Sequence, residues 1–179
     1  RNVWHYYCSP HFQNSALFPI IDQFQRGAGF ALSDSAETKA AKLKNLLTDL
    51  DPDIDLPIAL PLIADLLSIP VDSEYRLPPG SPEQRLERLL DALVALTVSI
   101  VKSRPSIIVF EDAQWMDATS LALIQKFVAQ IDTLPVLVLL TARPEFVPPW
   151  QKAHTLDLGR LDRTSSLQIV QDIAGGATL

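Results

Sequence analysis

A short apolar run that ends in two acids constrains the fold of this chain more than any other feature. Residues 106–110 (SIIVF) are largely apolar and rich in β-branched side chains, and Glu111 and Asp112 follow them directly. A strand without polar alternation is typical of a parallel sheet that is covered on both faces. Parallel strands need crossover connections, which are usually helical and right-handed. The run therefore predicts a layered α/β domain.

The remaining hydrophobic periodicity fits the same architecture, because short apolar runs alternate with stretches that repeat every three to four residues. Further strands are expected at residues 3–8, 135–141 and 155–158. Helices are expected at residues 14–26, 35–49, 57–68, 81–102, 117–131 and 164–174. Ser81 and Gln84 form a capping-box pattern at the start of the fourth of these helices.

The composition excludes several classes of function. The chain has 15 Lys and Arg against 21 Asp and Glu, and a formal net charge of −6 argues against a nucleic-acid-binding surface. Cys8 is the single cysteine, which excludes an internal disulfide and a multi-cysteine metal site, and the three histidines lack the spacing of a zinc site. No apolar run reaches the length of a membrane span, and the N-terminal stretch lacks the apolar core of a signal peptide. A reducing, cytoplasmic location is expected.

Charged residues follow two of the predicted strands. Glu111 and Asp112 come after the run at 106–110, and Arg143 comes after the run at 135–141. Ligands of open parallel sheets bind at the carboxyl ends of the strands, where these side chains are expected to meet. Magnesium takes carboxylate oxygens, and a second carboxylate can orient or deprotonate an attacking water. The pattern favours magnesium-dependent phosphate chemistry, with solvated acids at the strand end as the alternative.

Three segments resemble AAA-type and STAND signalling ATPases, in the order and spacing of that group. Residues 109–120 (VFEDAQWMDATS) resemble the extended Walker B segment, in which two acids are followed by an aromatic residue and an acidic helix cap. Residues 141–146 (TARPEF) are similar to the end of the sensor 1 strand, and residues 6–21 (YYCSPHFQNSALFPII) to the second strand and its helix. The resemblance implies a three-layer parallel sheet of P-loop NTPase type, with a helical insertion at about residues 30–80 between strands 2 and 3.

The resemblance also implies a role for each residue at the strand ends. Glu111 would take the place of the magnesium-side acid, acting through water, and Asp112 that of the catalytic acid, although the reverse order stays open. Arg143 would contact the γ-phosphate of ATP, where a guanidinium suits the charge that develops during phosphoryl transfer. The alternative for Arg143 is a surface arginine before a loop. Trp115 is expected to pack, and Asp117 to cap a helix.

The glycine-rich phosphate loop of these ATPases, G-x-x-x-x-G-K-[ST], does not occur in the sequence. We expect this loop, with strand 1, just upstream of Arg1, so that residues 1–161 form a partial core and residues 162–179 begin a helical lid. In the strand order of the family, 5-1-4-3-2, the loss of strand 1 leaves the pairing 4-3-2. The strand at 155–158 should then stand apart or pair with the strand at 135–141. The chain alone should be poorly stable and a weak nucleotide binder.

The function expected on these grounds is that of a regulatory domain that binds and hydrolyses ATP with Mg²⁺ in a multidomain signalling protein. The resemblance implies adenylate or guanylate cyclase, TPR or LuxR-type DNA-binding domains as partners in the same chain, whereas this segment should contact neither nucleic acid nor membrane. Two alternatives stay open: a nucleotide-dependent switch without significant hydrolysis, and a non-catalytic α/β interaction scaffold. A nucleophile formed by Cys8 and His11 is not favoured, because no third residue is evident to orient the pair.

Overall fold

The computed structural model describes residues 2–151, 153–160 and 162–173. Within these ranges, parallel strands form one sheet in the order β1-β2-β3. The strands are β1 (Asn2–Tyr7), β2 (Ser106–Glu111) and β3 (Val136–Leu140). The predicted pairing of the strands at 3–8, 106–110 and 135–141 is therefore confirmed.

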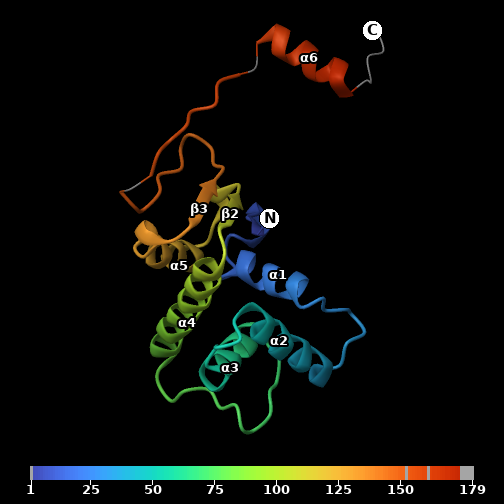
Figure 1. Ribbon diagram of the computed structural model, residues 1–179, viewed down its shortest axis with the longest axis vertical. Coiled ribbons are helices and arrows are strands. Elements are labelled where there is room, and N and C mark those ends of the chain that lie inside the picture. Colours follow the sequence, from blue (N-terminus) through green and yellow to red (C-terminus); the bar gives the residue numbers. More distant parts are fainter. Residues whose placement is uncertain (1, 152, 161, 174–179) are drawn as a thin grey trace.

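The helices alternate with the strands as the hydrophobic periodicity predicts. The α-helices are α1 (Phe18–Gly27), α2 (Ala36–Leu50), α3 (Leu56–Leu66), α4 (Pro82–Ser103), α5 (Ala118–Val128) and α6 (Arg163–Ile173). Short 3-10 helices are η1 (Pro10–Phe12), η2 (Ala113–Trp115) and η3 (Ile131–Thr133). None of the described helices is both long and apolar enough to cross a membrane. Figure 1 shows α1, α4 and α5 beside the sheet, α2 and α3 beyond them, and α6 apart from the rest.

Local capping explains where several helices begin. The Ser81 hydroxyl accepts from the backbone N–H of Gln84, whose side chain accepts from the backbone N–H of Ser81, so the predicted capping box is confirmed. The first helix starts later than predicted, at Phe18, because Leu17 has a left-handed backbone with φ of 58°. A helix cannot continue through such a residue.

The central strand β2 pairs residue for residue with both neighbours. Ile108 lies opposite Trp4 on one side and opposite Val138 on the other. At the start of the sheet, the Asn2 side chain donates to the Ser106 hydroxyl at 2.7 Å. Parallel strands in register end at the same edge, so the residues that follow β2 and β3 are brought together.

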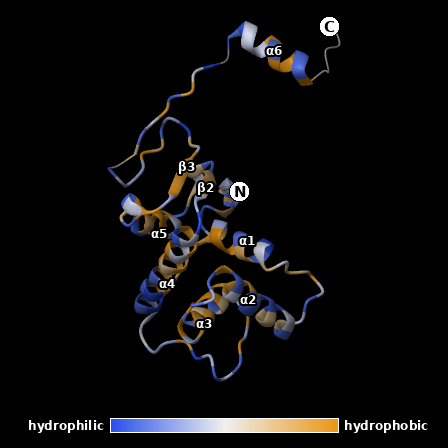
Figure 2. Ribbon diagram, viewed as in Figure 1, coloured by the Kyte–Doolittle hydropathy of each residue, from blue (hydrophilic) through white to orange (hydrophobic). Residues whose placement is uncertain are grey.

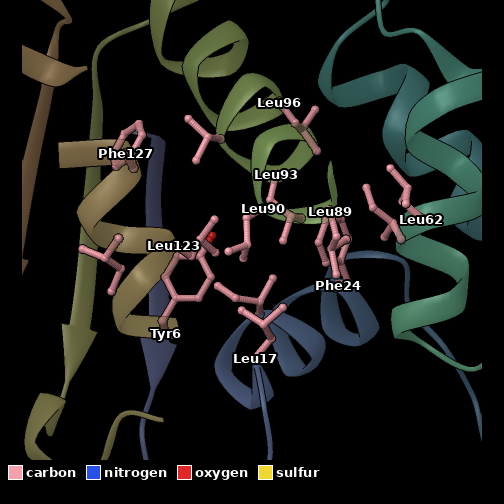
Figure 3. Close-up of a cluster of buried hydrophobic side chains, with 14 of the residues drawn as sticks. Tyr6, Leu17, Phe24, Leu62, Leu89, Leu90, Leu93, Leu96, Leu123 and Phe127 are labelled. Carbon is pink, nitrogen blue, oxygen red and sulfur yellow. The ribbon is translucent and has the colours of Figure 1, made fainter. Parts of the chain in front are cut away.

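One face of the sheet is covered by α1, α4 and α5. Ile108 and Phe110 of β2 are 2% and 5% exposed, and the Phe110 ring stacks on Tyr6 of β1 with centroids 4.7 Å apart. Figure 3 shows Tyr6 among leucines of α4, Leu123 of α5 and Leu17 at the start of α1. This shared apolar cluster holds the three helices against the strands.

The prediction that both faces of the sheet are covered is wrong for the described residues. On the second face Val3, Tyr7, Leu137 and Leu139 are exposed, with exposed fractions between 39% and 52%. The strands follow one another across the sheet in sequence order, and right-handed crossovers in one direction place every connecting helix on the same side. The apolar second face therefore lacks a covering helix from this part of the chain.

The helices α2 and α3 form a layer that packs on α4. Leu43, Leu47 and Ile63 are fully buried in it, and Figure 2 shows α3 as apolar along most of its length and α2 as mixed in hydropathy. α3 is apolar almost throughout and accommodates Pro61 as a buried residue. The predicted helices at 35–49 and 57–68 are confirmed within one or two residues.

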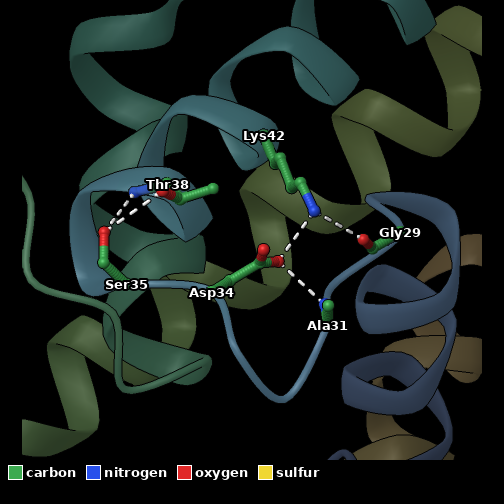
Figure 4. A network of polar contacts seen from close by, with 6 residues as sticks. All are labelled: Gly29, Ala31, Asp34, Ser35, Thr38 and Lys42. Carbon is green, nitrogen blue, oxygen red and sulfur yellow. Dashed lines mark hydrogen bonds and ion pairs between the residues drawn. The ribbon is translucent and has the colours of Figure 1, made fainter.

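A polar network fixes the loop between α1 and α2, as Figure 4 shows. The Asp34 carboxylate accepts from the Lys42 ammonium at 2.7 Å and from the backbone N–H of Ala31 at 2.8 Å. Lys42 also donates to the backbone carbonyl of Gly29 at 2.8 Å. These hydrogen bonds, the one from Lys42 first, lower the pKa of the Asp34 carboxyl.

The expected strand at 155–158 is absent, since these residues have no regular secondary structure. Leu156 and Leu158 are 83% and 87% exposed, and the outer edge of β3 has no strand partner among the described residues. Four residues with apolar alternation do not form a strand without a neighbour to supply hydrogen bonds and packing. The helix expected at 164–174 is confirmed as α6 through residue 173, while residue 174 lies outside the described residues.

Leu47→Ala should lower the free energy of unfolding by about 2–5 kcal/mol, because the side chain is 0% exposed and its removal leaves a cavity. Leu32→Ala should change it by less than about 0.5 kcal/mol, because Leu32 is fully exposed. Urea denaturation followed by circular dichroism measures both values. Equal losses in the two variants would contradict the described packing of α2.

Candidate functional site

The segments that follow β2 and β3 are joined by backbone and side-chain hydrogen bonds. The backbone N–H of Thr141 donates to the carbonyl of Phe110 at 2.9 Å, and that of Ala113 donates to the carbonyl of Thr141 at 2.8 Å. The Thr141 hydroxyl accepts from the backbone N–H of Asp112 at 3.0 Å. The ends of the two strands are therefore a single hydrogen-bonded unit, as the shared edge predicted.

Glu111 ends β2 on the uncovered face of the sheet. Its carboxylate lies 3.3 Å from Nδ1 of His5, and both side chains are 42% exposed. The backbone carbonyl of Glu111 accepts from the N–H of Cys8 at 3.0 Å, which continues the pairing with β1. Strand pairing thus fixes the position of Glu111, while its carboxylate remains open to solvent and to a ligand.

Asp112 leaves the strand in a left-handed conformation, with φ of 57° and ψ of 46°. This region is sparsely populated for residues with a side chain, and aspartate is among the few that tolerate it. The Asp112 carboxylate accepts from the side-chain amide of Gln114 at 3.1 Å. The two acids therefore differ in surroundings: Glu111 belongs to the sheet face, and Asp112 to the loop.

Arg143 is connected to the same loop through Gln114. The side-chain oxygen of Gln114 accepts from the backbone N–H of Arg143 at 3.1 Å, while its side-chain nitrogen donates to the Asp112 carboxylate. The Arg143 guanidinium carbon lies 5.6 Å from the centroid of the Trp115 ring, within cation–π distance. One glutamine thus bridges the segments that carry the candidate acid and the candidate phosphate-binding cation.

The structure places Glu111 at the end of β2, Asp112 just after it and Arg143 after β3, all at one edge of the sheet, but joins none of the three side chains directly. Within the part of the chain that the structure describes, no ion pair links Arg143 to either acid. No cluster of three or more His, Cys, Asp or Glu side chains could hold a metal there by itself. Magnesium is usually bound by one or two carboxylates together with substrate phosphates and water, so the two open carboxylates fit that ion.

Asp117 is not available to a ligand. It is 7% exposed, and one carboxylate oxygen accepts from the backbone N–H of Thr119, Ser120 and Leu17 at 2.9–3.2 Å. The predicted helix cap is therefore confirmed. Asp117 also accepts a hydrogen bond from Leu17, the left-handed residue that precedes α1. Packing around Asp117 ties α1 and α5 together beneath the site.

Sequence reasoning missed three participants: His5, Gln114 and Thr141. Thr141 and Gln114 act through hydrogen bonds between segments 29 residues apart, and His5 acts across a strand pair. None of these contacts has a local spacing that a sequence pattern could reveal. Thr141 could have been predicted from the sequence, because a polar residue that directly follows a buried strand lies at the ligand-binding edge.

A family model described as an AAA ATPase domain matches residues 6–139, which is most of the chain. The match begins in β1, includes Glu111 and Asp112, and ends in β3, before Arg143. No curated protein and no solved structure matches the chain.

The Cys8 thiol should resist alkylation. Burial, and then the carboxylates of Asp117 and Asp112, raise the pKa of Cys8 from its ordinary 9.0 to about 12. At pH 8, iodoacetamide should label the folded chain at least about 100-fold more slowly than the urea-unfolded chain, because the thiolate is the reactive form. Mass spectrometry measures both rates, and equal rates would contradict the buried position of Cys8.

The same pKa shift has a consequence for stability. A group whose pKa is raised on folding contributes stability that is present in full below its unfolded pKa. The contribution of the neutral Cys8 thiol should therefore be lost as the pH rises from about 9 to about 12. Cys8→Ala should remove this part of the pH dependence.

Proposed function

The chain belongs to the AAA ATPase domain family, and from this premise we propose that it is part of an ATP-hydrolysing regulatory domain of a multidomain signalling protein. The observation that carries the proposal is the hydrogen-bonded union of the β2 and β3 ends through Thr141 and Gln114. This union brings two open carboxylates and a guanidinium to the edge where open parallel sheets bind ligands. Family membership supports nucleotide as the ligand.

In this proposal each strand-end residue has a separate role. Glu111 binds magnesium through water, because its carboxylate is open and its backbone is fixed by the sheet. Asp112 orients the attacking water and takes its proton, since it lies in the loop with one hydrogen bond from Gln114. Arg143 contacts the γ-phosphate. Magnesium, when bound, neutralises charge on the transferred phosphoryl group.

The given sequence holds no Walker A pattern. In this proposal the phosphate cradle of the domain therefore comes from a segment outside the given sequence. Residues 1–161 serve as the partial core, and residues 162–179 as the start of a lid. The domain works in the cytoplasm and passes its nucleotide state to a cyclase, TPR or LuxR-type DNA-binding domain. A Walker A pattern within about 40 residues before Arg1, the length of one strand–loop–helix unit, would support this assignment.

A switch that binds nucleotide without significant hydrolysis is the second candidate. It is favoured by the contacts of the two acids, since the Glu111 carboxylate lies against His5 and the Asp112 carboxylate is held by Gln114. If the two carboxylates keep these partners when nucleotide is bound, the domain would hold the nucleotide without activating a water molecule. Turnover measurements separate this candidate from the first.

Asp112→Asn in the full-length protein should lower kcat for ATP hydrolysis by about 100-fold or more, because it removes the proposed base while keeping the shape of the side chain. ATP affinity should change little. Glu111→Gln should instead weaken the binding of Mg²⁺–ATP more than that of ATP alone. Steady-state turnover and equilibrium binding of a fluorescent ATP analogue measure these effects.

Glu145→Gln is the matched control, because Glu145 is an exposed carboxylate just after Arg143. It should leave turnover and binding unchanged. If Glu111→Gln lost turnover and Asp112→Asn kept it, Glu111 would be the catalytic base and Asp112 the magnesium ligand. Unchanged turnover in both variants would overturn the hydrolysis proposal, and a wild-type protein that binds ATP without turnover would establish the switch.

Arg143→Ala should remove most of the preference for ATP over ADP, because the guanidinium is proposed to contact the γ-phosphate alone. ADP affinity should stay within about threefold of wild type. This corresponds to a smaller change in binding free energy than the loss of one ordinary hydrogen bond. Arg160→Ala, at an exposed position beyond β3, is the control and should change neither affinity. Equal weakening of ATP and ADP by Arg143→Ala would contradict the assignment.

A further inference from the structure

Both backbone hydrogen-bonding groups of Arg143 are engaged. Its N–H donates to the side-chain oxygen of Gln114 at 3.1 Å, and its carbonyl accepts from the N–H of Phe146 at 3.0 Å. The second bond closes a four-residue turn in which Pro144 directly follows Arg143, and proline restricts the backbone at that position. The base of the Arg143 side chain is therefore fixed, although the residue itself is exposed.

The far end of the Arg143 side chain lies against an aromatic ring. The guanidinium carbon is 5.6 Å from the centroid of the Trp115 ring, and no salt bridge among the described residues includes Arg143. A carboxylate partner would occupy N–H donors of the guanidinium that a phosphate needs. An aromatic ring attracts the cation through its π-electrons and leaves those donors free. The ring therefore holds the guanidinium without competing with an anionic ligand.

The Trp115 ring is itself anchored. It is half-buried and packs against the hydrophobic core. Trp115 belongs to η2, in which Ala113 is 0% exposed, and Met116 directly after η2 is 5% exposed. The backbone N–H of Ala113 donates to the carbonyl of Thr141, just after β3, at 2.8 Å. Trp115 is thus fixed relative to the strand end that Arg143 follows.

We propose that Trp115 is a positioning residue, which holds the Arg143 guanidinium at the ligand-binding edge before nucleotide arrives. This inference rests on the proposed function, in which Arg143 contacts the γ-phosphate of ATP. A side chain that is already ordered loses less conformational freedom when it binds a phosphate, so the contact favours ATP. ADP lacks the γ-phosphate and gains nothing from it. Trp115 therefore sets part of the preference for ATP over ADP without touching the nucleotide.

Trp115→Met in the full-length protein tests the proposal, because methionine keeps an apolar side chain at this position but has no ring. ATP should bind about three- to fivefold less tightly, the range expected for the loss of one exposed cation–π contact, and ADP affinity should not change. Trp115→Phe keeps a ring that attracts cations more weakly, and it should bind ATP about twofold less tightly. Equilibrium displacement of a fluorescent ATP analogue by ATP and by ADP measures each affinity.

A double-mutant cycle separates positioning from support of the fold. In the Arg143→Ala background, Trp115→Met should have no further effect on ATP affinity, because no guanidinium is left to position. A ring that only supports the fold would lower ATP affinity equally in both backgrounds. Trp4→Met is the matched control, since Trp4 is a half-buried tryptophan near the start of β1, away from the strand ends that carry the site. It should change neither affinity, and circular dichroism checks that each variant folds.

Three results would overturn the proposal. The first is unchanged or tighter ATP binding by Trp115→Met, since tighter binding would mean that the ring competes with the phosphate. The second is an equal loss of ATP and ADP affinity in that variant. The third is an equal loss of ATP affinity with and without Arg143. Should Trp115→Met not fold, wild-type affinity of Trp115→Phe for ATP would overturn the proposal instead.

Arg143→Ala distinguishes failure of this inference from failure of the proposed function. If Arg143→Ala removes the preference for ATP while Trp115→Met leaves it intact, the role of Trp115 alone is overturned. If the preference survives in Arg143→Ala, the proposed contact of Arg143 with the γ-phosphate fails, and the role of Trp115 fails with it.

Discussion

The parallel pairing of β2 with both of its neighbours is the constraint on which the rest of the structure depends. Hydrogen bonds on its two sides leave β2 no freedom of register, since slipping by one residue would turn Ile108 and Phe110 away from the helices. The same pairing fixes where Glu111 ends the strand. Burial of the core and placement of the candidate site are therefore consequences of one register.

The pairing also explains which surfaces of the described residues stay uncovered. With strands in sequence order and helices on one side, the apolar face around Leu137 and Leu139 and the outer edge of β3 have no cover among the described residues. Exposed apolar faces and free strand edges promote association. The sequence also contains no Walker A pattern. The low stability expected for the chain stays a prediction.

Sequence patterns predicted the features that depend on local chemistry. The cap at Asp117, the capping box at Ser81 and the strand at 106–110 all rest on residues within a few positions of one another. The patterns failed where the outcome depends on partners: 155–158 alternates like a strand but has no neighbour to pair with. The bridge made by Gln114 was likewise invisible, because it connects loops whose proximity only the folded sheet creates.

The two acids at the end of β2 are adjacent in sequence but not equivalent in structure. A strand residue that is paired through its backbone keeps its side chain on one face, so Glu111 is fixed on the uncovered face, where its carboxylate lies 3.3 Å from Nδ1 of His5. Asp112 has turned into a left-handed loop that also holds Arg143 through Gln114. Gln114 links the two loops that carry Asp112 and Arg143, the residues proposed to act at the γ-phosphate, whereas Glu111, the proposed metal ligand, is held by strand pairing.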